Sequence, residues 1–246
     1  MPDEKPRYSK PPIQEAVFEV HYNLAQPLAK EAIESLKPVW TEAYPDQKTV
    51  EEKNFNLQLG PEGIKATEHK LGNKLFCRSS DGKRLVQLSS SLLAVNQLRP
   101  YPGWDESFRD TIQQRADEVQ KQIGPLQFRQ MALRYINRID IPETPLVWEH
   151  WFQFGLPVPK MDGGQPPHFQ MQFDMGIADG CRLTVNAVAL PVQQREISTV
   201  ILDIAVVWAG TPTDPSLLAE HMEKVHRPHR LAFESYLNDN LRALFY

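Results

Sequence analysis

The stretch QEAVFEVHY at residues 14–22 decides the fold, together with its counterpart LRYINRIDI at residues 133–141. Both stretches alternate apolar side chains with other side chains, and this period of two predicts a β-strand. Their layouts match but their charges are opposite, because the first has glutamates where the second has arginines. Two matching strands so far apart in the chain indicate two copies of one folding unit.

The charges of the two strands also predict how the strands meet. In an antiparallel pair, Glu15 can lie opposite Arg138 and Glu19 opposite Arg134, which gives two cross-strand ion pairs on one face. Exposed pairs of this kind contribute only about 0–1 kcal/mol each, so their main effect is to fix the register. The alternative is that both sets of charges are the solvated faces of unrelated strands.

Each half of the chain repeats one order of elements after its first strand. Residues 1–11 are expected to be a disordered tail or one strapped to the body. For residues 1–125 the pattern then predicts a strand over 12–23, a helix over 28–44 with a bend at Pro38, strands over 55–59, 64–69, 74–79, 84–89 and 92–98, and a helix over 104–123. For residues 126–246 it predicts a strand over 128–141, a short helix over 145–154, a hairpin of strands over 169–177 and 182–190, a strand over 197–209, and a terminal helix over 215–245 that Pro228 bends.

This order predicts an α+β fold of two tandem β-α-antiparallel sheet-α units, one in residues 1–125 and one in residues 126–246. The units are of the helix-grip or TATA-binding-protein-like kind, in which a curved sheet wraps round a long helix. We expect them to join at the central strand pair and to pack as one compact unit. The Pro/Gly-rich segment 156–170 is a lid over a pocket, a partner-binding loop or a passive insertion.

Composition narrows the class of protein. The 246 residues carry a net charge of −4, which argues against a dedicated nucleic-acid binder because such proteins carry a basic excess. No apolar run reaches the roughly 18 residues of a membrane span, and residues 1–12 are polar and proline-rich. We therefore expect a cytoplasmic protein without a transmembrane segment. Cys77 and Cys181 are expected to be reduced, buried thiols.

Several segments together resemble one known family. They are PPIQEAVFEV at 11–20, LVQLSSSLLAVNQLRPYPGWDESF at 85–108, LRYINRIDIP at 133–142, and the terminal helix with His226, Phe233 and Glu234. The chain resembles, nearly end to end, the TIGR04255 family, which is sporadically distributed among prokaryotes. That distribution is similar to the distribution of genes in mobile elements and defence loci, and it implies a role in defence against phage. The resemblance brings no catalytic motif.

Candidate binding residues lie on the second of the two matching strands. Asn137 is on the same face as Tyr135, where it lines a pocket or bonds to a neighbouring backbone group. Arg134 and Arg138, with Arg129, can bind an anion such as phosphate, or they can pair with the glutamates of the first strand. Aromatic residues, including Trp104 and Trp151, can stack bases, line an apolar cavity or fill the core.

Motifs for catalysis and cofactors are missing from the sequence. It has no GxSxG, no Walker loop and no GxGxxG after a strand, so we expect no catalytic residue and no cofactor. His226 and His229 are three positions apart and could ligate zinc together with a carboxylate. There is no HExxH motif, however, so we interpret them as structural or surface histidines and expect no metal.

These observations favour a non-enzymatic binding or sensor protein that acts with a partner protein. Its ligand would be a protein, a lipid-like molecule or another small apolar molecule, and a homo-oligomer is compatible with the sequence. One alternative is a nucleic-acid-binding accessory module that uses the arginines and aromatic stacking. The other is a divergent hydrolase.

Overall fold

The computed structural model describes residues 7–24, 30–60, 63–155, 169–191 and 196–246, without the side chains of 52–71 and 212. Within these ranges the protein is α+β, with one antiparallel sheet in the order β2-β3-β4-β5-β1-β6-β9-β8-β7. The strands are β1 (Ile13–Asn23), β2 (Asp46–Gly60), β3 (Gly63–Arg78), β4 (Arg84–Leu88), β5 (Leu92–Leu98), β6 (Gln127–Ile141), β7 (Gln170–Gly176), β8 (Cys181–Ala189) and β9 (Ser198–Thr213). The helices are α1 (Lys30–Glu34), α2 (Leu36–Trp40), α3 (Arg109–Ile123), α4 (Leu218–Tyr236) and α5 (Asp239–Ala243), with short helical turns η1 (Trp104–Phe108), η2 (Trp148–His150), η3 (Ala178–Gly180) and η4 (Pro215–Leu217).

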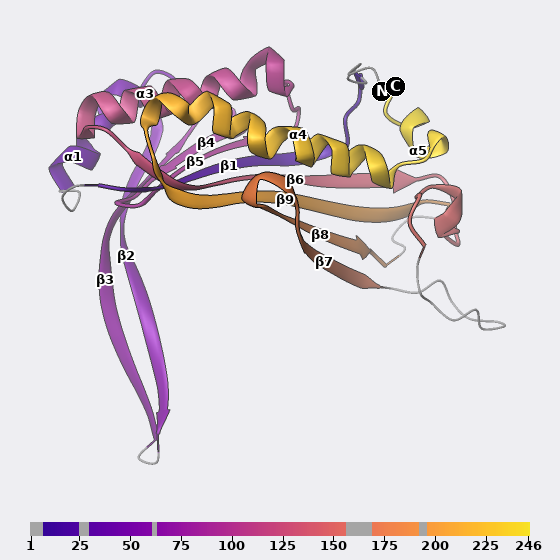
Figure 1. Ribbon diagram of the computed structural model, residues 1–246, viewed down its shortest axis with the longest axis horizontal. Coiled ribbons are helices and arrows are strands. Elements are labelled where there is room, and N and C mark those ends of the chain that lie inside the picture. Colours follow the sequence, from indigo (N-terminus) through magenta and orange to yellow (C-terminus); the bar gives the residue numbers. More distant parts are fainter. Residues whose placement is uncertain (1–6, 25–29, 61–62, 156–168, 192–195) are drawn as a thin grey trace.

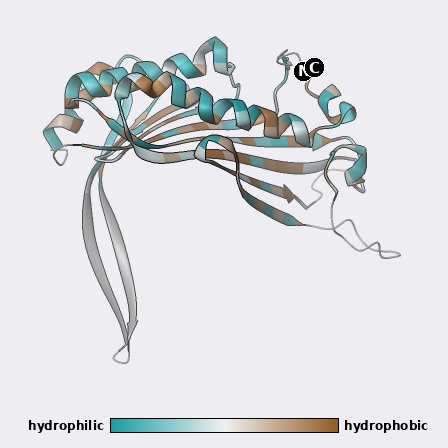
Figure 2. Ribbon diagram, in the orientation of Figure 1, coloured by the Kyte–Doolittle hydropathy of each residue, from teal (hydrophilic) through white to brown (hydrophobic). Residues whose placement is uncertain are grey.

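The two long helices, α3 and α4, lie on the same side of the sheet (Figure 1). Their outward faces are largely hydrophilic, whereas the strands carry much of the hydrophobic sequence (Figure 2). The core lies between the two layers and includes Phe18 of β1, Leu133 of β6, Ile112 of α3 and Val225 of α4. The ribbon of β2 and β3 extends away from the helices on the other side of the sheet (Figure 1).

The two matching strands, β1 and β6, are neighbours at the centre of the sheet and run antiparallel, as the sequence predicts. The predicted register is wrong by two residues, because Val17 rather than Glu19 lies opposite Arg134. A shift of two residues keeps every side chain on its own face, so the alternation of the sequence could not choose between the two registers. An irregularity between Ile13 and Glu15 also interrupts the ladder.

The predicted ion pairs of these strands are replaced by others. Arg134 makes a bidentate pair with Asp203 of β9, with Nε–Oδ1 at 2.8 Å and Nη2–Oδ2 at 2.6 Å. Arg138 pairs with Asp140 of its own strand at 3.2 Å. Glu15 accepts a hydrogen bond from Asn96 at 2.7 Å, and Glu19 lies 3.8 Å from His21. The opposite charges of the two strands are therefore neighbours on one face, but not direct partners.

Other predicted elements differ in length. The strands predicted over 55–59, 64–69 and 74–79 belong to the two long strands β2 and β3, and the helix predicted over 28–44 is seen as α1 and α2. The helix predicted over 145–154 is only the turn η2, since Glu143 Oε2 binds the backbone N–H of Val147 and the indole of Trp151 there. The terminal helix continues through Pro228 and ends at Tyr236, before α5. Most of the segment 156–170 lies outside the described residues.

Candidate ligand-binding pocket

A pocket of about 690 Å³ lies between β6, α4, the turn η1 and the N-terminal segment 7–13. This volume is within the range of about 300–1,000 Å³ that is typical of small-molecule sites. Its lining includes Tyr101, Trp104, Tyr135, Asn137, His226 and His229. The sheet forms the base, and the two other elements and the N-terminal segment form the sides.

The aromatic side of the pocket depends on the break in the chain before α3. Gly103 has a φ of 107°, which a residue with a Cβ rarely adopts, and a Cβ there would also collide with Glu106. The turn η1 then begins at Trp104, whose indole stacks on His226 with ring centres 4.1 Å apart and donates to Glu223 Oε1 at 2.9 Å. Trp104 is thereby fixed between α4 and the pocket.

Two tyrosines complete this side. The hydroxyl oxygens of Tyr101 and Tyr135 lie 2.6 Å apart, so one hydroxyl donates to the other. Burial raises the pKa of both phenols, and both are therefore protonated at neutral pH. Because only one of the two protons is used in their mutual hydrogen bond, the pair keeps one O–H donor.

The base of the pocket is built on two carbonyl groups of β9. Asn137 Nδ2 donates to Leu202 O at 2.9 Å, and His229 Nε2 lies 3.0 Å from Ile204 O. A carbonyl oxygen only accepts hydrogen bonds. The Asn137 atom that faces Leu202 O is therefore the amide nitrogen, and the His229 nitrogen that faces Ile204 O is the one that carries the hydrogen of the neutral ring. Burial lowers the pKa of His229 to about 3, so the ring is neutral at pH 7. Asn137 therefore both lines the pocket and bonds to a neighbouring backbone group.

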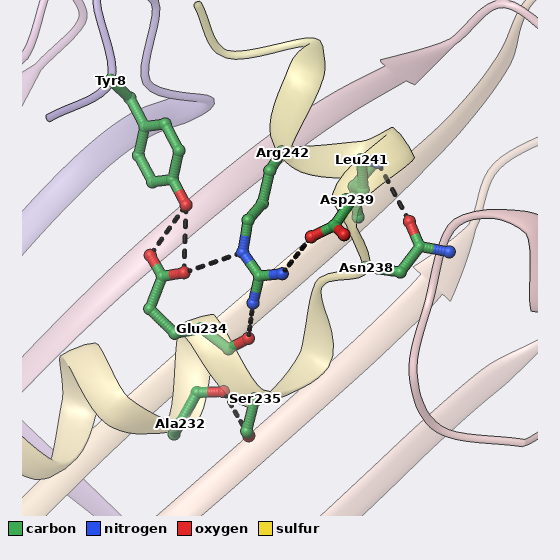
Figure 3. Close-up of polar contacts among 8 residues, drawn as sticks. All are labelled: Tyr8, Ala232, Glu234, Ser235, Asn238, Asp239, Leu241 and Arg242. Carbon is green, nitrogen blue, oxygen red and sulfur yellow. Dashed lines mark hydrogen bonds and ion pairs between the residues drawn. The ribbon is translucent and has the colours of Figure 1, made fainter. Parts of the chain in front are cut away.

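The N-terminal segment is held against the end of α4 by Tyr8 (Figure 3). The Tyr8 hydroxyl donates to the Glu234 carboxylate, with distances of 2.9 and 3.0 Å to its two oxygens, and Arg242 Nε donates to Oε2 at 3.2 Å. Burial and the hydrogen bond to Glu234 raise the pKa of Tyr8. Lys10 N also donates to Phe245 O at 2.8 Å. Residues 7–13, the N-terminal strap, thus close one side of the pocket.

The structure brings three of the candidate binding residues together. Trp104, Tyr135 and Asn137 all line the pocket. Arg134 and Arg138 lie on the opposite face of β6, with their carboxylate partners. Trp151 is apart from the pocket, where it donates to Glu143 Oε2 at 2.6 Å.

Sequence reasoning missed the contributions of the N-terminal strap and of Tyr101 to the pocket. It also assigned His226 and His229 to structural roles, although they line the pocket as well as pack. The one available indication was the proline and glycine break at 100–103, because breaks before helices often line sites.

The structure offers neither a metal site nor a membrane-spanning helix among the residues it describes. Over the described part of the chain, no group of three or more histidine, cysteine, aspartate or glutamate side chains is placed to hold a metal ion. No helix there is both long enough and apolar enough to span a bilayer.

Cys77 and Cys181 are buried and form no disulfide, as the sequence predicts.

No family model matches this chain, and no curated protein matches it either. The resemblance to the TIGR04255 family remains a prediction.

Proposed function

We propose that this chain is a non-enzymatic binding or sensor protein that holds a small molecule in the pocket beneath α4. The observation that carries the proposal is the pocket itself, where buried aromatic and amide side chains line a volume of about 690 Å³. Apolar walls with a few fixed polar groups are typical of sites that bind and orient small molecules.

The N-terminal strap gives the protein a way to report an occupied pocket. Tyr8, Pro12 and Ile13 line the pocket, while Tyr8 also binds Glu234 at the end of α4. A ligand that contacts this segment stabilises one position of the strap and of the adjoining helix end. We propose that a partner protein recognises this change, in the cytoplasm, and that the pair acts in antiphage defence.

The arrangement of the chain is part of this proposal. We propose that residues 1–125 and 126–246 are tandem helix-grip or TATA-binding-protein-like units. The antiparallel pairing of β1 with β6 and the position of α3 and α4 on one face support it. The alternative of nucleic-acid binding receives less support, since Arg134 and Arg138 already pair with Asp203 and Asp140.

The test is native mass spectrometry of the protein purified gently from its own host, followed by thermal unfolding with the identified molecule. A ligand that binds only the folded state stabilises it by about 2.7 kcal/mol at a hundred times its dissociation constant. We expect Asn137→Leu to abolish this stabilisation, because it removes the amide from the pocket.

Arg138→Leu is the matched control, since it changes the next residue of the same strand on the opposite face. Circular dichroism establishes that both variants are folded. Equal stabilisation of the two variants by the ligand would contradict a binding site in this pocket.

A further inference from the structure

At the base of the pocket, the side-chain atoms that are left to bind a ligand are hydrogen-bond acceptors. The amide nitrogen of Asn137 donates to the carbonyl groups of Leu202 and Tyr135, and the Nε2–H of His229 donates to Ile204 O. Asn137 Oδ1 and His229 Nδ1 are left, and neither receives a hydrogen bond from a residue that the structure describes. Both residues are only 1% exposed as a whole, and both line the pocket.

The two acceptors come from two elements, Asn137 from β6 and His229 from α4. Their side chains are anchored on carbonyls two residues apart along β9, which places the anchors about 7 Å from each other, since a strand rises about 3.4 Å per residue. An amide oxygen and an unprotonated imidazole nitrogen can both accept a hydrogen bond from a ligand with N–H groups. The complementary ligand is therefore a donor.

The aromatic surface of the pocket also favours a cationic donor. The rings of Tyr101, Trp104 and Tyr135 supply aromatic surface, which attracts ammonium groups and packs against planar apolar bodies.

We propose that the pocket binds a small primary amine with an aromatic body, whose ammonium group donates to Asn137 Oδ1 and His229 Nδ1. The aromatic body packs against Tyr101, Trp104 and Tyr135. This inference rests on the proposed function of the pocket as a small-molecule site, and it adds the chemical class of the ligand.

The experiment is isothermal titration calorimetry of the full chain with four probes of similar shape. Tryptamine has the ammonium group, 3-ethylindole has none, indole-3-propionate has a carboxylate instead, and N,N,N-trimethyltryptammonium keeps the positive charge without an N–H. We expect tryptamine to bind roughly 10–100-fold more tightly than each of the other three, as for hydrogen bonds to a charged group. Asn137→Leu is expected to remove most of this preference, and Arg138→Leu to keep it.

Three outcomes overturn the amine proposal. The carboxylate or the neutral probe could bind as tightly as tryptamine, the trimethylated probe could bind equally well, or tryptamine could fail to bind at millimolar concentration. If native mass spectrometry then finds another small molecule that Asn137→Leu excludes, the pocket remains a binding site and only the ligand class is wrong. If it finds none, the proposed function fails as well.

Discussion

The helices α3 and α4 cover the same face of one sheet, but their buried polar side chains are satisfied differently. Beneath α3, Arg115 Nη1 pairs with Glu118 Oε2 at 2.9 Å, and the indole of Trp40 donates to the same oxygen at 2.7 Å. Beneath α4, His229 bonds to a strand carbonyl and borders the pocket. The first half thus holds an internal ion pair in its core, although Arg115 Nε is buried there without a hydrogen-bond partner. The second half leaves polar atoms facing a cavity, which shows that one architecture supports both outcomes.

The largest expected effect tests the closed core beneath α3. Arg115→Met keeps an unbranched apolar stem but leaves the Glu118 carboxylate, which is 17% exposed, without its cation. We expect the free energy of unfolding in urea to fall by about 2–4 kcal/mol, because breaking one partner of a buried pair leaves an uncompensated charge. Lys121→Met, at an exposed position of the same helix, is the control. A cost for Arg115→Met no larger than that of the control would show that the pair does not close the core.

The next effect concerns the neutral histidine beneath α4. The unfolded chain binds a proton at this residue near pH 6.5, whereas the folded protein binds it only near pH 3. The contribution of His229 to the free energy of unfolding is therefore complete above about pH 7. It is lost as the pH falls from about 6.5 towards 3, by up to about 3 kcal/mol between pH 7 and pH 4. Urea unfolding at several pH values measures it, and His229→Gln should remove this part of the slope. The exposed His150→Gln serves as control, and equal slopes in both variants would argue against a buried neutral His229.

A smaller effect tests the N-terminal strap. Tyr8→Phe removes the hydroxyl that binds Glu234 while keeping the ring packed near Phe233 and Phe245. We expect a loss of about 1–2 kcal/mol and faster amide hydrogen exchange in the last two turns of α4. Tyr246→Phe, at a tyrosine that is 60% exposed, is the comparison. Unchanged exchange in Tyr8→Phe would mean that the strap does not hold this helix end.

The smallest effect lies on the sheet face away from the helices. A double-mutant cycle of Arg134→Ala with Asp203→Ala should give a coupling of about 0.5–1 kcal/mol, since the pair is exposed on one side. The same cycle with Glu19→Ala should give a smaller value, because Glu19 is diagonal to Arg134. A larger coupling to Glu19 would restore the register that the sequence predicted.

Local sequence patterns predicted most helices, strands and turns. Contacts with residues outside the local pattern determine the register of β1 with β6 and the shape of segment 145–154. The strands β1 and β6, the helical run 104–123 and the turn at 178–180 follow from periodicity and turn residues within a few positions. The two-residue shift between β1 and β6 does not, since both registers bury the same faces. The helix predicted over 145–154 failed because Glu143, outside that run, binds the segment in another shape.

The residues of the pocket were likewise predictable from the sequence only where a local pattern places them. Tyr135 and Asn137 follow from the inward face of one strand, and Trp104 from the start of a helix beside it. The roles of Tyr8 and His229 depend on contacts with residues 226 and 25 positions away, respectively, which no local pattern reports. Arg134 and Arg138 were placed on the correct face of the strand but not in the pocket.

The central position of β1 also has a consequence for synthesis of the protein. Phe18 pairs across the sheet with Leu133, which the ribosome adds 115 residues later. At about 5–20 residues per second, roughly 6–23 s pass between the synthesis of Phe18 and that of Leu133. During that time a strand with five apolar residues, from Ala16 to Tyr22, has an unpaired edge on the side that β6 will occupy. We expect nascent chains stalled before residue 127 to need a chaperone, and chains stalled well beyond residue 141 to need it less.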